Sequence, residues 1–473
     1  MRATILLMVK KASGSESRFE DYLERIAAVL GHEDRREPLR GYLVGLSLPG
    51  ERKSIEPMAA RVDPRHVRAR HQSLHHFVSN APWDDEGVLR VARDYVLEQM
   101  ERHGAVAAWI VDDTGIPKKG RHSVGVARQY CGVLGKQDNC QVAVTVTMAN
   151  EAASVPAAYR LYLPETWTSD GRRRSEAAIP EEVTFQTKWQ IALDQIARLR
   201  KEGLPPAPVV ADAGFGVVTA FRDALTEWGV PYLVGVTSQT TAWRPGAQPQ
   251  PPPAYGGRGR PPTLVRRSKS RHPVSIQVLA EKLPDAAWQT ITWRQGSRGA
   301  MRSRFACVRV RPAHRDQRRD HAREEEWLII EWPRGEAAPT KSWFSTLPAD
   351  TACEQLVRLA KLRWRIERDY ENSSRKSGWI TSKAEGGEAF ITTGSYASRP
   401  MPSWLPSALG FPPLSLSPSC EPLLYPEVSR RGALPIRPER HVPESIATFR
   451  AMRIRAVLRR LPCVWCGNQP HAR

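Results

Sequence analysis

Trp109-Ile110-Val111-Asp112-Asp113-Thr114-Gly115 joins a short apolar run to two consecutive carboxylates. A second apolar run, Val209 to Ala211, leads directly into Asp212 and then into the turn sequence Gly214-Phe215-Gly216. Short apolar runs that end at turn residues are typical of buried strands. We therefore predict an α/β core in which acidic side chains lie at the ends of two strands.

A third acidic residue lies on a predicted helix. Residues 352–370 carry apolar side chains at three- and four-residue steps and include Arg363 and Glu367. Taken singly, a strand-end aspartate commonly caps a turn, and a glutamate among arginines commonly forms a surface ion pair. Together, the order strand-Asp, strand-Asp, helix-Glu predicts a site for hard cations, because Mg²⁺ prefers oxygen ligands and two such ions promote phosphodiester chemistry.

The chain is strongly basic. Its 473 residues include 70 Lys and Arg against 50 Asp and Glu, which gives a formal net charge of +20. Such a charge attracts polyanions and favours nucleic acid as the partner, although an arginine-rich solvated surface is the alternative. The apolar fraction of 41% is that of a globular protein, and the length suggests two or three domains.

Cysteine usage and hydropathy suggest a cellular location. The seven cysteines show no pairing pattern, so we expect free thiols in a reducing cytoplasm, with the protein associated with the nucleoid. No apolar run approaches the ~20 residues that a membrane helix needs, so no membrane contact is expected.

The order of these patterns predicts six segments. Residues 240–262 are rich in Pro and Gly, and five strand-like runs follow at 274–279, 288–293, 305–310, 327–332 and 341–345. The expected segments are a non-native extension (1–18), a helical N-terminal DNA-binding domain (19–104), the first part of the α/β core (105–239), a linker with a β-rich insertion (240–350), a core helix carrying Glu367 (351–371) and an irregular, disordered tail (372–473).

Basic residues near the predicted site are candidates for phosphate contacts. Arg258-Gly259-Arg260-Pro261 is suited to a narrow minor groove or is simply a basic linker. The expected DNA-binding residues are Lys118, Lys119, Arg121, Arg258, Arg260, Arg266, Arg267, Lys269 and Arg363. Trp293 either stacks on an extruded base or belongs to the core.

These features resemble the DDE transposases of bacterial insertion sequences, in the branch with a Tyr-x2-Arg-x3-Glu-x6-Lys signature. Asp113-Thr114 matches the first motif, Asp212 the second, and Arg363-x3-Glu367 the centre of the signature. The first two acids are 99 residues apart and the last two 155 apart, and the longer gap suits the β-rich insertion of that branch. The resemblance covers Phe19 to Glu371.

The resemblance implies an RNase H-like core in which Asp113, Asp212 and Glu367 hold two Mg²⁺ (or Mn²⁺) ions, with Asp112 as the alternative first ligand. It also implies cleavage at the terminal inverted repeats of an element, followed by attack of the freed 3′-hydroxyl on target DNA. The partner is then double-stranded DNA, with the protein acting as a dimer on it. Two alternatives are a stand-alone metal-dependent endonuclease and a catalytically dead DNA-binding remnant.

Two positions depart from the signature, because Ala360 stands where it has Tyr and Ser374 where it has Lys. If permissible codons are chosen for residues 372–393 and one base is restored after the Glu371 codon, the frame encodes a Lys at the second of these positions and continues the apolar stripe. Trp379 has a single codon, which limits the freedom of this reconstruction. We therefore predict a frameshift after Glu371 that impairs activity. The alternative is a genuine, divergent tail.

Overall fold

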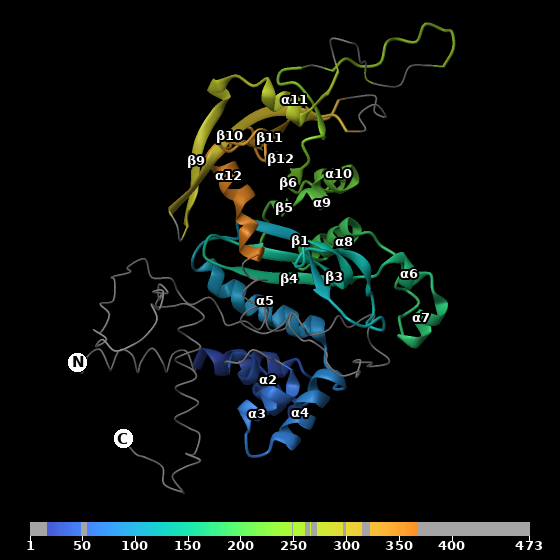
Figure 1. Ribbon diagram of the computed structural model, residues 1–473, viewed down its shortest axis with the longest axis vertical. Coiled ribbons are helices and arrows are strands. Elements are labelled where there is room, and N and C mark those ends of the chain that lie inside the picture. Colours follow the sequence, from blue (N-terminus) through green and yellow to red (C-terminus); the bar gives the residue numbers. More distant parts are fainter. Residues whose placement is uncertain are drawn as a thin grey trace, which may run out of the picture. The chain divides into compact units, whose positions relative to one another are not determined.

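The computed structural model describes residues 17–48, 54–247, 249–260, 265, 272–296, 299–314 and 322–367 (Figure 1). The predictions for the tail, for most of the N-terminal extension and for Arg266, Arg267 and Lys269 lie outside these residues. Contacts divide the chain into two units, which separate between His103 and Gly104 in the described part. Each unit is described by itself below.

The described part of the first unit is helical. Asp84 accepts a hydrogen bond from the backbone N–H of Glu86 and so caps the last helix of this unit. Apolar side chains such as Ile26, Leu39, Met58 and Leu74 are fully buried. The elements are a helix over residues 17–28, a short 3-10 turn η1 (Glu33–Arg35), α2 (Arg36–Ser47), α3 (Ile55–Val62), α4 (Val67–Ser79) and α5 (Asp85–Glu101).

The second unit is built on a mixed sheet, which confirms the α/β class. Its central strands are β1 (Ala108–Pro117), β3 (Lys136–Ala149), β4 (Ser154–Tyr162), β5 (Val209–Ala211) and β6 (Tyr232–Val236), in the order β4-β3-β1-β5-β6. The strands β1, β5 and β6 run parallel, and β3 is antiparallel to both β1 and β4. A further strand, β2 (Ala127–Cys131), pairs with the start of β3.

Helices fill the connections of this core. The longest of them, α8 (Lys188–Lys201), packs on β3 and β4, and Gln195 donates a hydrogen bond to the carbonyl of Val144. The shorter ones are α6 (Glu165–Thr168), α7 (Gly171–Glu176), α9 (Ala213–Gly216) and α10 (Thr219–Glu227). No helix in the described part of the chain is long and apolar enough to cross a membrane.

The predicted β-rich insertion extends the core sheet. Its last strand, β12 (Lys341–Ser345), pairs antiparallel with β6, and β11 (Glu326–Glu331) and β10 (Gly299–Pro312) follow outward. Beyond them, β9 (Trp288–Gly296) and β7 (Thr241–Trp243) pair with different parts of β10, and β8 (Val274–Ser275) pairs with β7. The core and the insertion therefore share one sheet.

One predicted strand in the insertion is wrong. Residues 274–279 were expected to be extended, but only β8 is, and α11 (Ile276–Glu281) begins directly after it. Ser275 caps this helix by accepting a hydrogen bond from the N–H of Val278, and the buried residues Ile276, Leu279 and Ala280 have helical spacing. A short apolar run does not distinguish a strand from a buried helix, which explains the error. A 3-10 turn, η2 (Asp285–Ala287), precedes β9.

The helix α12 (Cys353–Leu362) lies against β9, β10 and β6 (Figure 1). Its buried residues Leu356, Val357 and Ala360 join a core cluster that includes Ile110 of β1 and Val210 of β5. A turn at Arg363 separates α12 from the helical residues 364–367.

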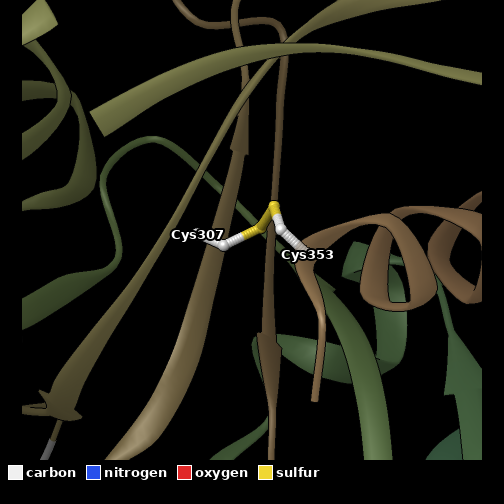
Figure 2. The surroundings of a disulfide bond; sticks show 2 residues. All are labelled: Cys307 and Cys353. Carbon is white, nitrogen blue, oxygen red and sulfur yellow. A yellow bond between two sulfur atoms is a disulfide. The ribbon is translucent and has the colours of Figure 1, made fainter. Parts of the chain in front are cut away.

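A disulfide joins Cys307 of β10 to Cys353 at the start of α12 (Figure 2). The expectation of free thiols is therefore wrong for this pair, although Cys131 and Cys140 are free and buried. The two bonded residues are 46 positions apart in sequence, with Cα atoms 5.9 Å apart. No local pattern reveals such a pairing, because it depends on how α12 docks on the sheet.

Candidate active site

The strand β1 runs through both consecutive aspartates. Its pairing with β3 continues to the pair Pro117 and Cys140, six residues beyond the point where the apolar run of the sequence ends. Successive side chains of a strand point to opposite faces of the sheet. Asp112 therefore shares a face with Ile110, which packs in the α12 cluster, and Asp113 points to the other face.

The face of Asp112 is also the face of Asp212. Val111 is in register with Ala211 on the neighbouring parallel strand, so Asp112 lies beside Asp212, which follows β5 directly. Asp212 caps α9 by accepting a hydrogen bond of 2.9 Å from the N–H of Gly214. The turn lies so close to β6 that a Cβ at Gly216 would be 2.0 Å from the carbonyl oxygen of Gly235. This contact gives a reason for the glycine after the second motif.

Arg363 connects these residues to the third predicted acid. Its Nη1 donates to Oδ2 of Asp112 at 2.8 Å, and its Nη2 donates to Oε1 of Glu367 at 2.7 Å. The guanidinium fork thus holds two carboxylates from different elements, one on β1 and one beyond α12. Asp112, Asp212, Arg363 and Glu367 form what we call the acidic cluster.

The acidic cluster contains three carboxyl groups and one guanidinium group. Burial raises the pKa of Asp112 to about 7, and the nearby charges of Asp212 and Asp113 add to this rise against the opposing effect of Arg363. Burial alone would lower the pKa of Arg363, but the charges of Asp112, Glu367 and Asp212 raise it above its ordinary value. Three carboxylates face one guanidinium, so a further cation would be favourable here.

Asp113 has a different partner on the opposite face. It forms an ion pair with Lys188 at the first turn of α8, and both side chains are about one-third exposed. The aspartate first expected in the site is therefore turned away from Asp212 and Glu367, and the alternative residue Asp112 lies with them. Nothing in the sequence pointed to Lys188, because its partner is 75 positions away.

The donor set suits a hard cation, although a complete metal site is not formed. Among the residues that the structure describes, no three Asp, Glu, His or Cys side chains converge closely enough to hold a metal ion. The predicted convergence of three carboxylates is replaced by a chain in which Arg363 lies between Asp112 and Glu367. Carboxylate oxygens of the kind that Asp112, Asp212 and Glu367 supply, only partly balanced by Arg363, are nevertheless what Mg²⁺ or Mn²⁺ would bind.

The candidate DNA-binding residues after β1 differ in exposure. Lys119 and Arg121 are exposed, whereas Lys118 is partly buried and its pKa is lowered by that burial. The Asn139 side chain donates to the carbonyls of Lys118 and Gly120 and so holds this loop in place. Two of the three cations are thus available to a phosphate backbone.

The remaining candidates lie elsewhere. Arg258 and Arg260 are exposed, in agreement with a linker that faces solvent. Arg363 contacts Asp112 and Glu367 in the acidic cluster. Its spacing of four residues from Glu367 is the sequence signal that could have identified the contact between Arg363 and Glu367.

Comparisons with known proteins identify relatives. A family model described as DDE superfamily endonuclease matches residues 25–300. Over 168 residues the chain is 33% identical to a protein from Microchaete diplosiphon named as a probable transposase for the insertion sequence element IS701. This similarity covers 35% of the present chain and 41% of the length of that relative.

Proposed function

The chain belongs to the DDE superfamily of endonucleases, and we therefore propose that it is an insertion-sequence transposase that cuts DNA at the ends of an element and joins them to a target. The observation that carries this proposal is the acidic cluster, because it brings together a carboxylate on β1, one directly after β5 and one in the helical segment after α12. The order β4-β3-β1-β5-β6, with only β3 antiparallel, supports an RNase H-like core.

We assign Asp112, Asp212 and Glu367 as the carboxylates that would hold two Mg²⁺ or Mn²⁺ ions, with Asp112 in place of Asp113. Bound ions would supply activation of a water or 3′-hydroxyl and stabilisation of the leaving oxygen of a phosphodiester. Asp112 and Asp212 are fixed on adjacent strands, so their oxygens are oriented before DNA binds. Arg363 neutralises part of their charge and orients Glu367 toward them.

The DNA would be held by cations from two regions of the chain. Lys119 and Arg121 are exposed in the loop after β1, and Arg258 and Arg260 are exposed in the linker between β7 and β8. Phosphate contacts of this kind position a duplex without reading its sequence. We propose terminal inverted repeats and target DNA as the substrates, a dimer assembled on DNA, and action at the nucleoid.

The activity of this particular chain is a separate proposal. Ser374 in place of the signature Lys, together with the codon reconstruction after Glu371, supports a frameshift and therefore impaired strand transfer. A DNA-binding remnant without catalysis is the second candidate. The nucleotide sequence around codon 371, and the flanking inverted repeats, would test the frameshift directly.

The assignment of the first carboxylate is tested by matched asparagine variants. With Mn²⁺ and DNA that carries the element's ends, D112N and D212N should each lower the rate of strand cleavage at least ~100-fold, whereas D113N should retain activity within about threefold. Loss of cleavage in D113N with activity kept in D112N would contradict the assignment. Cleavage without joined products would favour a stand-alone endonuclease, and tight binding without cleavage in the unaltered chain would favour the remnant.

A further inference from the structure

Two consecutive residues of β9 form cation–ring contacts with residues on either side of Arg363. The Nζ atom of Lys361 lies 4.5 Å from the centre of the Trp293 ring, and the Cζ atom of Arg294 lies 3.7 Å from the centre of the Trp364 ring. In the first contact the strand supplies the ring and the helix the cation, and in the second the roles are exchanged. We call Trp293, Arg294, Lys361 and Trp364 the reciprocal clasp.

A bulge in β9 makes the reciprocal clasp possible. The ladder pairs Arg294 with Met301 and Thr292 with Arg302, so that Trp293 is left without a partner in the register. In a regular strand, neighbouring side chains point to opposite faces and only one of them would reach the helix. A bulge redirects a side chain, and here consecutive side chains contact residues on either side of Arg363.

Lys361 is fixed by more than one ring. It forms a 2.6 Å ion pair with Glu331 of β11, and the side chains of the pair are only 15% and 7% exposed. The rings of Phe305 and Trp343 lie 5.4 and 5.6 Å from its Nζ atom. Burial lowers the pKa of Lys361, an effect that the Glu331 carboxylate opposes. A lysine in this environment anchors the helix and is not available to DNA.

The helix is therefore held by the insertion at both ends. The disulfide between Cys307 and Cys353 fixes its first residue to β10 (Figure 2). The reciprocal clasp fixes the residues around Arg363. Arg363 then reaches across to Asp112 on the central strand β1. The hairpin of β9 and β10 is thus physically connected to the acidic cluster through one short segment.

We propose that Trp293, Arg294 and Lys361 are positioning residues that set where Arg363 and Glu367 lie relative to Asp112. The positioning role toward the metal site depends on the proposed function, whereas the clasp itself is a property of the fold. In this arrangement the ring of Trp293 covers a cation of its own chain. This role differs from stacking on an extruded base.

Hydrogen exchange tests the clasp without metal or DNA. In the full chain, Arg294→Gln and Trp293→Ala should each speed exchange of the backbone amides of residues 356–367 and leave β1 and β5 unchanged. Arg294→Lys and Trp293→Phe keep a cation and a ring, and should restore the slow exchange. Arg302→Gln, an exposed arginine on the same hairpin, is the matched control and should have no effect. Unchanged exchange in Arg294→Gln and Trp293→Ala would overturn the clasp.

Binding of Mn²⁺ alone, measured by calorimetry, tests the positioning role. Arg294→Gln should weaken Mn²⁺ affinity about tenfold because Glu367 is no longer held in place, and it should lower the thermal midpoint by no more than the loss of one cation–ring contact allows. Arg294→Lys should recover affinity to within about threefold of the original. Faster exchange with unaltered Mn²⁺ affinity would overturn the positioning role. If the unaltered chain binds no Mn²⁺, the proposed function fails and the positioning role toward the metal site with it, while the exchange data still decide the clasp.

Discussion

The two adjacent aspartates of β1 lie in different environments on opposite faces of the sheet. Asp112 and Asp113 have the same side chain and adjacent positions, yet one is buried beside Asp212 and the other forms an ion pair with Lys188 that is about one-third exposed. Strand alternation alone produces this difference. Burial and the nearby charges of Asp212 and Asp113 then raise the pKa of Asp112.

The raised pKa of Asp112 predicts a pH effect on the metal-free protein. Its pKa is about 7 in the folded state and near 4 when unfolded, so the folded state binds more protons between these values. The free energy of unfolding should therefore fall as pH rises from about 4 to about 7, by at most ~4 kcal/mol from this group. D112N removes the ionisation, so its stability relative to the unaltered chain should increase over this range.

Urea denaturation with a chelator present, at pH 5 and pH 8, measures this difference. D113N keeps the buried carboxyl and removes only the smaller effect of the neighbouring charge, so it is the control and should retain most of the pH dependence of the unaltered chain. Parallel pH profiles for D112N and the unaltered chain would show that Asp112 is not destabilised by burial.

At the scale of single elements, α12 is placed by one apolar face. Leu356 and Val357 are completely buried in the cluster that also holds Ile110 of β1 and Val210 of β5. These contacts join the third acid of the site to the strands that carry the first two. The helix is short, so the position of Glu367 depends on this packing more than on helix propensity.

Truncating Leu356 should therefore be costly. Leu356→Ala leaves a cavity in a fully buried position and should lower the free energy of unfolding by about 2–5 kcal/mol. Leu359 on the same helix is only partly buried, so Leu359→Ala is the matched control and should cost distinctly less. Denaturant titration of both variants checks this, and equal losses would mean that α12 does not dock through Leu356.

At the scale of the whole molecule, the net charge of +20 would favour the proposed binding of DNA. Each phosphate that a lysine or arginine neutralises releases counterions, so affinity falls as salt concentration rises. The loop after β1 contains two exposed cations that could contact phosphates and one cation that is partly buried. Lys119 and Arg121 belong to the first kind and Lys118 to the second.

Salt titration of DNA binding distinguishes these residues. Plotting the logarithm of affinity against that of salt concentration, Lys119→Ala and Arg121→Ala should each reduce the magnitude of the slope by about one. Lys118→Met should leave the slope unchanged, because Lys118 is partly buried. An affinity that stays flat between ~50 and ~200 mM salt would contradict electrostatic binding altogether.

The sequence by itself determined the α/β class and the positions of β1 and β5, with acids within or directly after these strands, because apolar periodicity and turn residues are local signals. It also carried the resemblance to DDE enzymes, which the family match confirms. It located four of the insertion strands but assigned α11 to a strand, since a run of six residues fits both structures.

Only the tertiary structure decided the features that depend on residues far apart in the chain. The pairing of β1 with β3 extends the strand through both aspartates. Because side chains alternate along a strand, Asp112 and not Asp113 lies on the side of the acidic cluster. The pairing of β12 with β6 joins the insertion to the core sheet, and the docking of α12 brings Cys353 to Cys307 and Arg363 to Asp112. None of these contacts has a local signature, because each exists only when separate segments pack together.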